Sequence, residues 1–212
     1  MPLITLGANI AQALKKNEVI PDVLDDFQPS GVITVSYGGS VEANLGNTLK
    51  VDETQSRPEI HASFTDPDAS TAGSTYTLIL TDPDAPSRTD KSYSEYLHHI
   101  VTGLKLKPIN SGSTDPDQFS AADVAASFAT PIDFSSGHEL VPYMGPGPPP
   151  KTGLHRYIYI LFKETKPSLT KFDGDRPRFG TDKPGYGVRS FAAEHGLIPV
   201  AVNFYYAQNE QQ

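Results

Sequence analysis

Six short runs rich in β-branched and aromatic residues dominate this chain and restrict its fold more than any other feature. Such residues suit the pleated, half-buried surface of a β-sheet. Helical segments do not regularly separate the runs, as they would in an alternating parallel sheet. We therefore predict a mainly β fold whose strands pair mostly antiparallel. The six runs cover residues 32–37, 59–64, 75–81, 139–143, 156–162 and 197–206.

Helical spacing of apolar residues is found near both ends of the chain. Within residues 10–27 the apolar side chains recur every three or four positions, and Pro21 interrupts them. Within residues 188–195 they share one helical face, and Gly196 follows where a left-handed residue would end a helix. We expect one or two short helices before residue 28 and another near the C-terminus, all peripheral to the sheet.

Composition limits the classes of partner. A chain of 212 residues with 37% hydrophobic content suits one domain over residues 1–212. The net charge of -8 disfavours nucleic acid as a partner. Residues 1–20 do not resemble a signal peptide, and no window approaches the roughly 20 apolar residues of a membrane span. We expect a cytoplasmic protein without integral membrane association, and the absence of cysteine fits a reducing compartment.

The segment 109–136 is rich in Ser, Asp, Ala and Pro and carries no clear apolar period. Such a composition indicates a long surface loop rather than a packed element. One helical turn is expected around residues 121–128.

A loop with two carboxylates follows the apolar run 75–81 directly. Its sequence is Asp82-Pro83-Asp84-Ala85-Pro86, and the prolines end sheet pairing and stiffen the loop. Taken alone, this motif is weak and favours a polar turn in which the Asp side chains accept from nearby backbone N–H groups.

The segment MGPGPPPKTGLHRY, residues 144–157, combines bare glycines with restrictive prolines before an apolar run. Gly145 and Gly147 leave their backbone N–H groups uncovered, and convergent N–H groups can bind an anion. In a strand, His155 and Tyr157 would share one face and Arg156 would lie on the other. A buried guanidinium requires a carboxylate, and we predict that Asp84 is its partner.

Adjacent histidines at 98 and 99 would point to different faces of a strand, so at most one can share a pocket with His155. Asp82, His98 and His155 could in principle supply mixed metal ligands. However, the chain has no HExxH pair, no cysteine and no calcium-loop spacing, so we expect neither metal nor cofactor. It also lacks a GxSxG elbow, a dinucleotide loop and a P-loop, and no catalytic nucleophile is evident.

Three segments together resemble the phosphatidylethanolamine-binding protein family. They are TDPDAPSR at 81–88, the segment 93–99 and GPGPPPKTGLHRY at 145–157, within a similarity that runs from about Phe27 to Tyr206. FQPSG at 27–31, GNTL at 46–49 and VNFYYA at 202–207 look most like the fungal branch, which includes inhibitors of the serine carboxypeptidase called carboxypeptidase Y. The resemblance implies a large central antiparallel sheet packed with a smaller one, with helices at the edges.

The resemblance also implies a small anion pocket at one end of the sheet. His99 stands where relatives usually carry an apolar residue, and it is left outside this site. The glycine amides, both imidazoles and Tyr157 are expected to donate to phosphate oxygens, with Asp82 orienting a histidine or accepting from an ammonium group. The residues carried over are Asp82, Pro86, Tyr93, His98, Gly145, Gly147, Pro148, Pro149, His155 and Tyr157.

We accordingly predict a non-enzymatic protein that binds a phosphate-bearing small molecule or a phospholipid head group, more weakly well above pH 6.5, the unperturbed histidine pKa. Inhibition of a serine carboxypeptidase is its most concrete expected role. The sequence leaves open whether the protein is also found in the vacuole. A regulator of kinase or small-GTPase signalling and a His/Asp-dependent hydrolase of phosphate esters are the alternatives.

Overall fold

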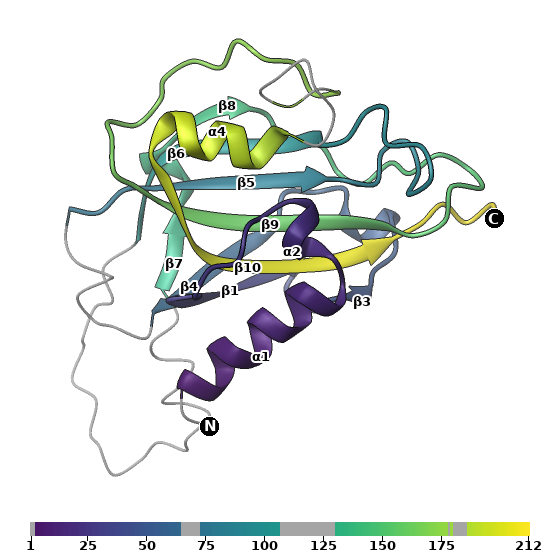
Figure 1. Ribbon diagram of the computed structural model, residues 1–212, viewed down its shortest axis with the longest axis horizontal. Helices are drawn as coiled ribbons and strands as arrows, with labels where there is room; N and C mark the ends of the chain where they lie inside the picture. The colour runs from purple at the N-terminus through teal and green to yellow at the C-terminus, as the bar shows by residue number, and fades with distance from the viewer. Residues whose placement is uncertain (1–2, 65–72, 107–129, 178, 180–185) are drawn as a thin grey trace.

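The computed structural model describes residues 3–64, 73–106, 130–177, 179 and 186–212 (Figure 1). The predicted helical turn at 121–128 lies outside these ranges. Within them the helices are α1 (Leu3–Lys16), α2 (Val19–Asp22) and α4 (Gly187–His195), with short 3-10 turns η1 (Asp52–Thr54) and η4 (Phe134–Ser136). The strands are β1 (Gly31–Tyr37), β2 (Val41–Ala43), β3 (Asn47–Thr48), β4 (Glu59–Phe64), β5 (Tyr76–Asp82), β6 (Tyr96–Leu106), β7 (Thr130–Asp133), β8 (His138–Val141), β9 (His155–Glu164) and β10 (Leu197–Ala207).

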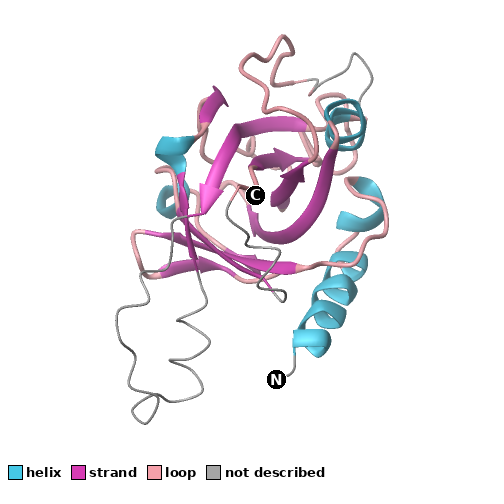
Figure 2. Ribbon diagram, turned by 90° about the vertical axis from the view of Figure 1, so that its left-hand side faces the viewer, coloured by secondary structure: helices cyan, strands magenta, loops and turns pink. Residues whose placement is uncertain are grey.

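The strands form one large, nearly closed sheet, which confirms the predicted mainly β fold (Figure 2). Their order is β2-β1-β4-β7-β6-β5-β9-β10-β3, and β8 pairs with β6 beside this path. The pairs are antiparallel except for β3, which runs parallel to β10. The smaller layer, β2-β1-β4-β7, is continuous with the larger one because the last residues of β6 pair with β7.

The central strands are buried on both faces, since each face packs against a different core. Leu78 and Leu80 of β5 point into a core between the two layers, whereas Ile79 points into a core beneath the helices. On β9, Tyr159 points into the core between the layers and Ile160 into the core beneath the helices. This arrangement explains why these strands read as continuous apolar runs, although successive side chains point to opposite faces.

The structure corrects one element prediction and bears out another. Residues 130–133 lie in the predicted loop 109–136 but form β7, which pairs with β4 through only two residues, Pro131 and Thr130. A four-residue strand containing proline leaves almost no period in the sequence. The helix near the C-terminus is placed as expected, and Gly196 ends it with φ of 66°.

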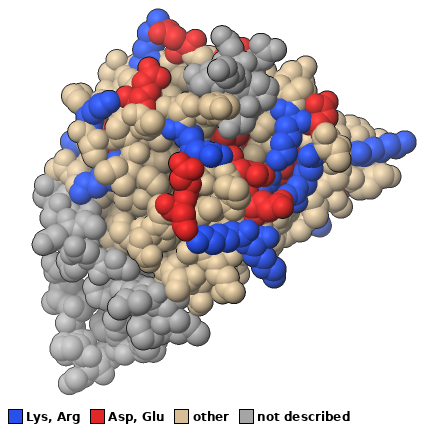
Figure 3. All heavy atoms as spheres, in the orientation of Figure 1, with Lys and Arg blue, Asp and Glu red and all other residues tan. Residues whose placement is uncertain are grey.

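Acidic and basic side chains mix on the face that carries the α1–α2 corner. Figure 3 shows them interspersed rather than gathered by sign. Arg88 pairs with Glu18 at this corner, and Lys91 pairs with Asp22 at 3.1 Å. These exposed pairs join the loop after β5 to the helices, although each contributes little stability alone.

A buried ion pair beneath this corner confirms the predicted partner of Arg156. The guanidinium of Arg156 is fully buried, and its Nε and Nη2 donate to the two oxygens of Asp84 at 2.9 and 2.7 Å. It also donates to Asp22 and to the backbone carbonyls of Asn17 and Glu18. Burial opposes the charge, but Asp84 and Asp22 outweigh it and raise the pKa of Arg156. The side chain thereby ties β9 and the loop after β5 to the first two helices.

We expect Arg156→Met to lower the free energy of unfolding by roughly 3–5 kcal/mol, because it removes the buried, doubly hydrogen-bonded partner of the Asp84 carboxylate and leaves the more distant Arg88 at 3.6 Å. Urea unfolding of this variant, of Asp84→Asn and of the double variant measures the coupling. The double variant should lose less than the sum of the two single losses. A strictly additive result would mean that the pair contributes no interaction energy.

Candidate functional site

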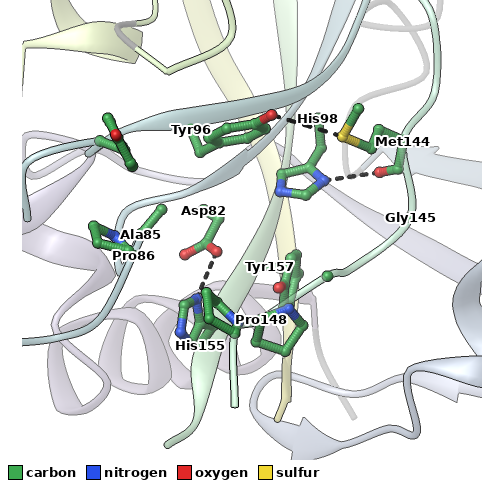
Figure 4. Close-up of a pocket in the computed structure, with 13 residues that line it drawn as sticks. Asp82, Ala85, Pro86, Tyr96, His98, Met144, Gly145, Pro148, His155 and Tyr157 are labelled. Carbon is green, nitrogen blue, oxygen red and sulfur yellow. Dashed lines mark hydrogen bonds and ion pairs between the residues drawn. The ribbon is translucent and has the colours of Figure 1, made fainter. Parts of the chain in front are cut away.

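A pocket of about 220 Å³ opens at one end of the larger layer. Strand β5 ends at Asp82, where its antiparallel neighbours β6 and β9 begin, so three strand ends meet at this edge. The segment before β9 closes the other side (Figure 4). All ten residues predicted for the site line this pocket, together with Ala85, Tyr96 and Met144, which were not predicted.

The two adjacent histidines enter different surroundings, as the strand period predicted. His98 lines the pocket and lies at a β-bulge, because Leu80 pairs with His99 while Thr81 pairs with Leu97. Such a bulge re-aims the side chain of the extra residue. His99 is fully buried elsewhere, and its Nε2 lies 2.9 Å from a carboxylate oxygen of Glu139.

The imidazole of His98 is anchored to the segment before β9 through its Nδ1 nitrogen. Its Nδ1 lies 2.8 Å from the Met144 carbonyl oxygen, which can only accept, so Nδ1 carries the hydrogen (Figure 4). Burial, with a smaller contribution from the charge of Arg176, lowers the pKa of His98 against the opposing effects of Asp82 and the Met144 hydrogen bond. The ring is therefore neutral near pH 7, and protonation of Nε2 would give it a charged donor.

His155 is held by partners on both ring nitrogens. Nδ1 lies 2.8 Å from Asp82 Oδ2, and Nε2 lies 2.9 Å from the hydroxyl of Thr152. The side chains of His155 and Asp82 are only 1% and 4% exposed, so water does not compete for these contacts. Both ring nitrogens of His155 thus have protein partners in this structure, so the expectation that His155 donates to a ligand requires that it give up one of them.

Tyr157 forms the floor of the pocket. Its ring stacks on Tyr205 with centroids 5.5 Å apart, and the edge of His98 packs against it at 5.2 Å. Burial and the negative charge of Asp82 raise its pKa well above the ordinary value for tyrosine. The phenol thus keeps its proton and can donate to an anion.

The Gly-Pro segment is braced from two sides. Gln55 of the loop after η1 donates to the Pro146 carbonyl at 2.9 Å, and Asn209 of the C-terminal tail donates to the Pro148 carbonyl at 3.1 Å. A Cβ on Gly145 would lie 2.9 Å from the Gln55 Cα. Close packing therefore accounts for glycine at 145.

Some missed residues left a signal in the sequence and others did not. Tyr96 lies two positions before His98, so the strand period could have placed it in the pocket. Thr152 lies in a turn three residues before His155, where nothing in the sequence distinguishes it from an ordinary loop threonine.

Within the described ranges, no three His, Asp or Glu side chains are grouped so that they could hold a metal ion. The helices described are also too short or too polar to cross a membrane.

Comparison with known proteins identifies the family. The model of the family "Phosphatidylethanolamine-binding protein" matches residues 25–206, and the chain belongs to this family. It is 35% identical to the carboxypeptidase Y inhibitor of Saccharomyces cerevisiae, over 92% of this chain and 93% of that protein.

Solved structures agree with this assignment. A carboxypeptidase Y inhibitor in complex with its cognate proteinase superimposes with a TM-score of 0.80 at 34% identity, covering 96% of this chain and 97% of the inhibitor. A phosphatidylethanolamine-binding protein from Plasmodium vivax has a TM-score of 0.65 at 23% identity, covering 94% and 97% of the two chains, and shows the shared fold.

Buried His99 makes stability depend on pH. Burial lowers its pKa from 6.5 to about 4. Between these pH values the unfolded chain binds a proton at this histidine and the folded chain does not. The free energy of unfolding should therefore fall as pH decreases from 6.5 toward 4. In His99→Gln, which keeps a donor for Glu139, this decline should be shallower.

Urea unfolding at pH 7.5 and pH 5 measures the slope, and His138→Gln at an exposed site serves as the control. Identical slopes for His99→Gln and the parent protein would show that His99 does not carry the effect.

Proposed function

We propose that this protein is a non-enzymatic member of its family that binds phosphate-bearing ligands in the pocket and inhibits a serine carboxypeptidase. The convergence of His98, Tyr157 and the Gly-Pro segment on one cavity supports ligand binding. Similarity along nearly the whole chain to a carboxypeptidase Y inhibitor supports the inhibitory role.

The donors in the pocket favour a small anion. Nε2 of His98 becomes a charged donor when the ring is protonated, and the phenol of Tyr157 adds a neutral one. Asp82 does not meet the ligand as an unpaired charge, because His155 bonds to it. The prolines and the two braces hold these groups in place before the ligand arrives, which reduces the entropy lost on binding.

We expect anion affinity to increase as pH falls, because the anion favours the protonated form of His98. Sulfate is the appropriate probe, since a phosphate monoester changes its own charge near pH 6. Sulfate should bind at least about tenfold more tightly at pH 5.5 than at pH 8, given the lowered pKa of His98. His98→Gln should bind weakly at both values. Calorimetric titration giving equal affinities for the parent protein would exclude His98 as the titrating donor.

The hydrogen bonds at His155 argue against the hydrolase alternative. Asp82, His155 and Thr152 are connected in the order of an acid, a base and a nucleophile. However, the Thr152 hydroxyl donates its single hydrogen to the Pro149 carbonyl at 2.7 Å, so it has none to give to His155. His155 donates to this oxygen instead of activating it.

Inhibition is tested by following peptide hydrolysis by carboxypeptidase Y in the presence of the protein. Micromolar protein should suppress hydrolysis, and heat-unfolded protein should not. Undiminished turnover with the folded protein would reject the inhibitory role. Signalling regulation and cytoplasmic localisation stay predictions, because no contact among the described residues favours a particular partner or compartment.

A further inference from the structure

Thr152 determines which nitrogen of His155 carries hydrogen. Its hydroxyl lies 2.7 Å from the Pro149 carbonyl oxygen and 2.9 Å from His155 Nε2. A hydroxyl has one hydrogen, and a carbonyl can only accept, so that hydrogen points to Pro149. The oxygen of Thr152 is then free only to accept, and Nε2 of His155 must be the donor.

The contact at the other ring nitrogen, Nδ1, determines the net charge of Asp82 and His155 together. With hydrogen on Nε2, the 2.8 Å contact between Nδ1 and Asp82 Oδ2 requires a second hydrogen between these two atoms. The other oxygen of Asp82 accepts from the backbone N–H of Asp84. Whether the shared hydrogen lies closer to nitrogen or to oxygen, Asp82 and His155 together carry no net charge.

We infer that Thr152 is a positioning residue whose hydroxyl keeps the Asp82–His155 pair neutral, and that this neutrality lets the pocket accept an anion. The second half of this inference rests on the proposed anion binding. The first half concerns the unliganded protein and can be judged alone.

The other charged groups around the pair are already balanced. Asp84 is paired with the buried Arg156, and Arg88 lies 3.6 Å from the same carboxylate. Arg176, which influences His98, donates to backbone carbonyls rather than into the pair. Tyr157 and His98 are neutral near pH 7. Near pH 7 the protonation of the Asp82–His155 pair therefore decides the charge that an entering anion meets. Lower pH adds the charge of His98, equally in every variant that keeps His98.

Without the Thr152 hydroxyl, Nε2 of His155 has no acceptor for its hydrogen, and the pair would release that proton to solvent. Nδ1 would then donate its hydrogen to an ionised Asp82, and Nε2 would carry a bare lone pair. The pair would gain one negative charge next to the anion site, where charges are only partly screened.

Three variants separate this effect from simple loosening of the loop. Thr152→Val keeps the shape of the side chain and removes the hydroxyl, whereas Thr152→Ser keeps the hydroxyl. Asn209→Ala removes a different brace on the same segment without touching His155.

The deciding measurement is the nitrogen chemical shift of His155 Nε2, read by NMR at pH 7.5 without ligand. Nε2 should carry hydrogen in the parent protein, in Thr152→Ser and in Asn209→Ala, and should be bare in Thr152→Val. A bare Nε2 in the parent protein, or a hydrogen-bearing Nε2 in folded Thr152→Val, would overturn the inference. If Thr152→Val does not fold, the parent protein and Thr152→Ser still decide it.

Sulfate titration at pH 5.5 tests the second half. Affinity should fall about tenfold or more in Thr152→Val, because of the added charge, and stay within about twofold in Thr152→Ser. Asn209→Ala should lose less than Thr152→Val, and an equal loss would assign the effect to the loop. If the parent protein binds no sulfate, the proposed function fails, while the Nε2 measurement still judges the role of Thr152.

Discussion

Arg156 lies between two pocket residues on β9, and its guanidinium is buried on the opposite face of the strand from them. There it binds Asp84, two residues after the pocket carboxylate of Asp82, and reaches the corner between α1 and α2. A buried arginine is stable only when its N–H groups are hydrogen-bonded. Strand β9, the loop after β5 and the corner between α1 and α2 must therefore meet in one arrangement. The pocket wall on β9 and the loop after β5 are therefore positioned from behind by the same side chain.

The sheet supplies the other constraint. Strands β5 and β9 are buried on both faces, and their side chains pack into one core or the other. A ligand site therefore cannot lie along the middle of these strands. Functional groups can collect only where strands end. Asp82, His98 and His155 lie at such ends, and antiparallel pairing brings the end of β5 to the starts of β6 and β9.

Local chemistry in the sequence predicted much of this arrangement. The strand period separated His98 from His99 and Arg156 from its neighbours, and the cost of burying a guanidinium pointed to Asp84. The period could not show the bulge at His98, because a bulge depends on the partner strand. Nor could it show that Thr152 occupies Nε2 of His155, since that contact depends on how the Gly-Pro turn folds back. Strands β3 and β7 were not predicted for a related reason. Each is defined by pairing with a neighbouring strand rather than by a pattern in its own residues.

The braces on the Gly-Pro segment have a consequence for the order in which the molecule opens. Gln55 and Asn209 reach this segment from 91 and 61 residues away in sequence. Contacts of that kind form only after the strands between them have assembled, and they contribute single hydrogen bonds rather than buried apolar area. Loss of either brace is therefore expected to loosen residues 145–150 while the central strands, which are held by buried apolar side chains on both faces, stay folded.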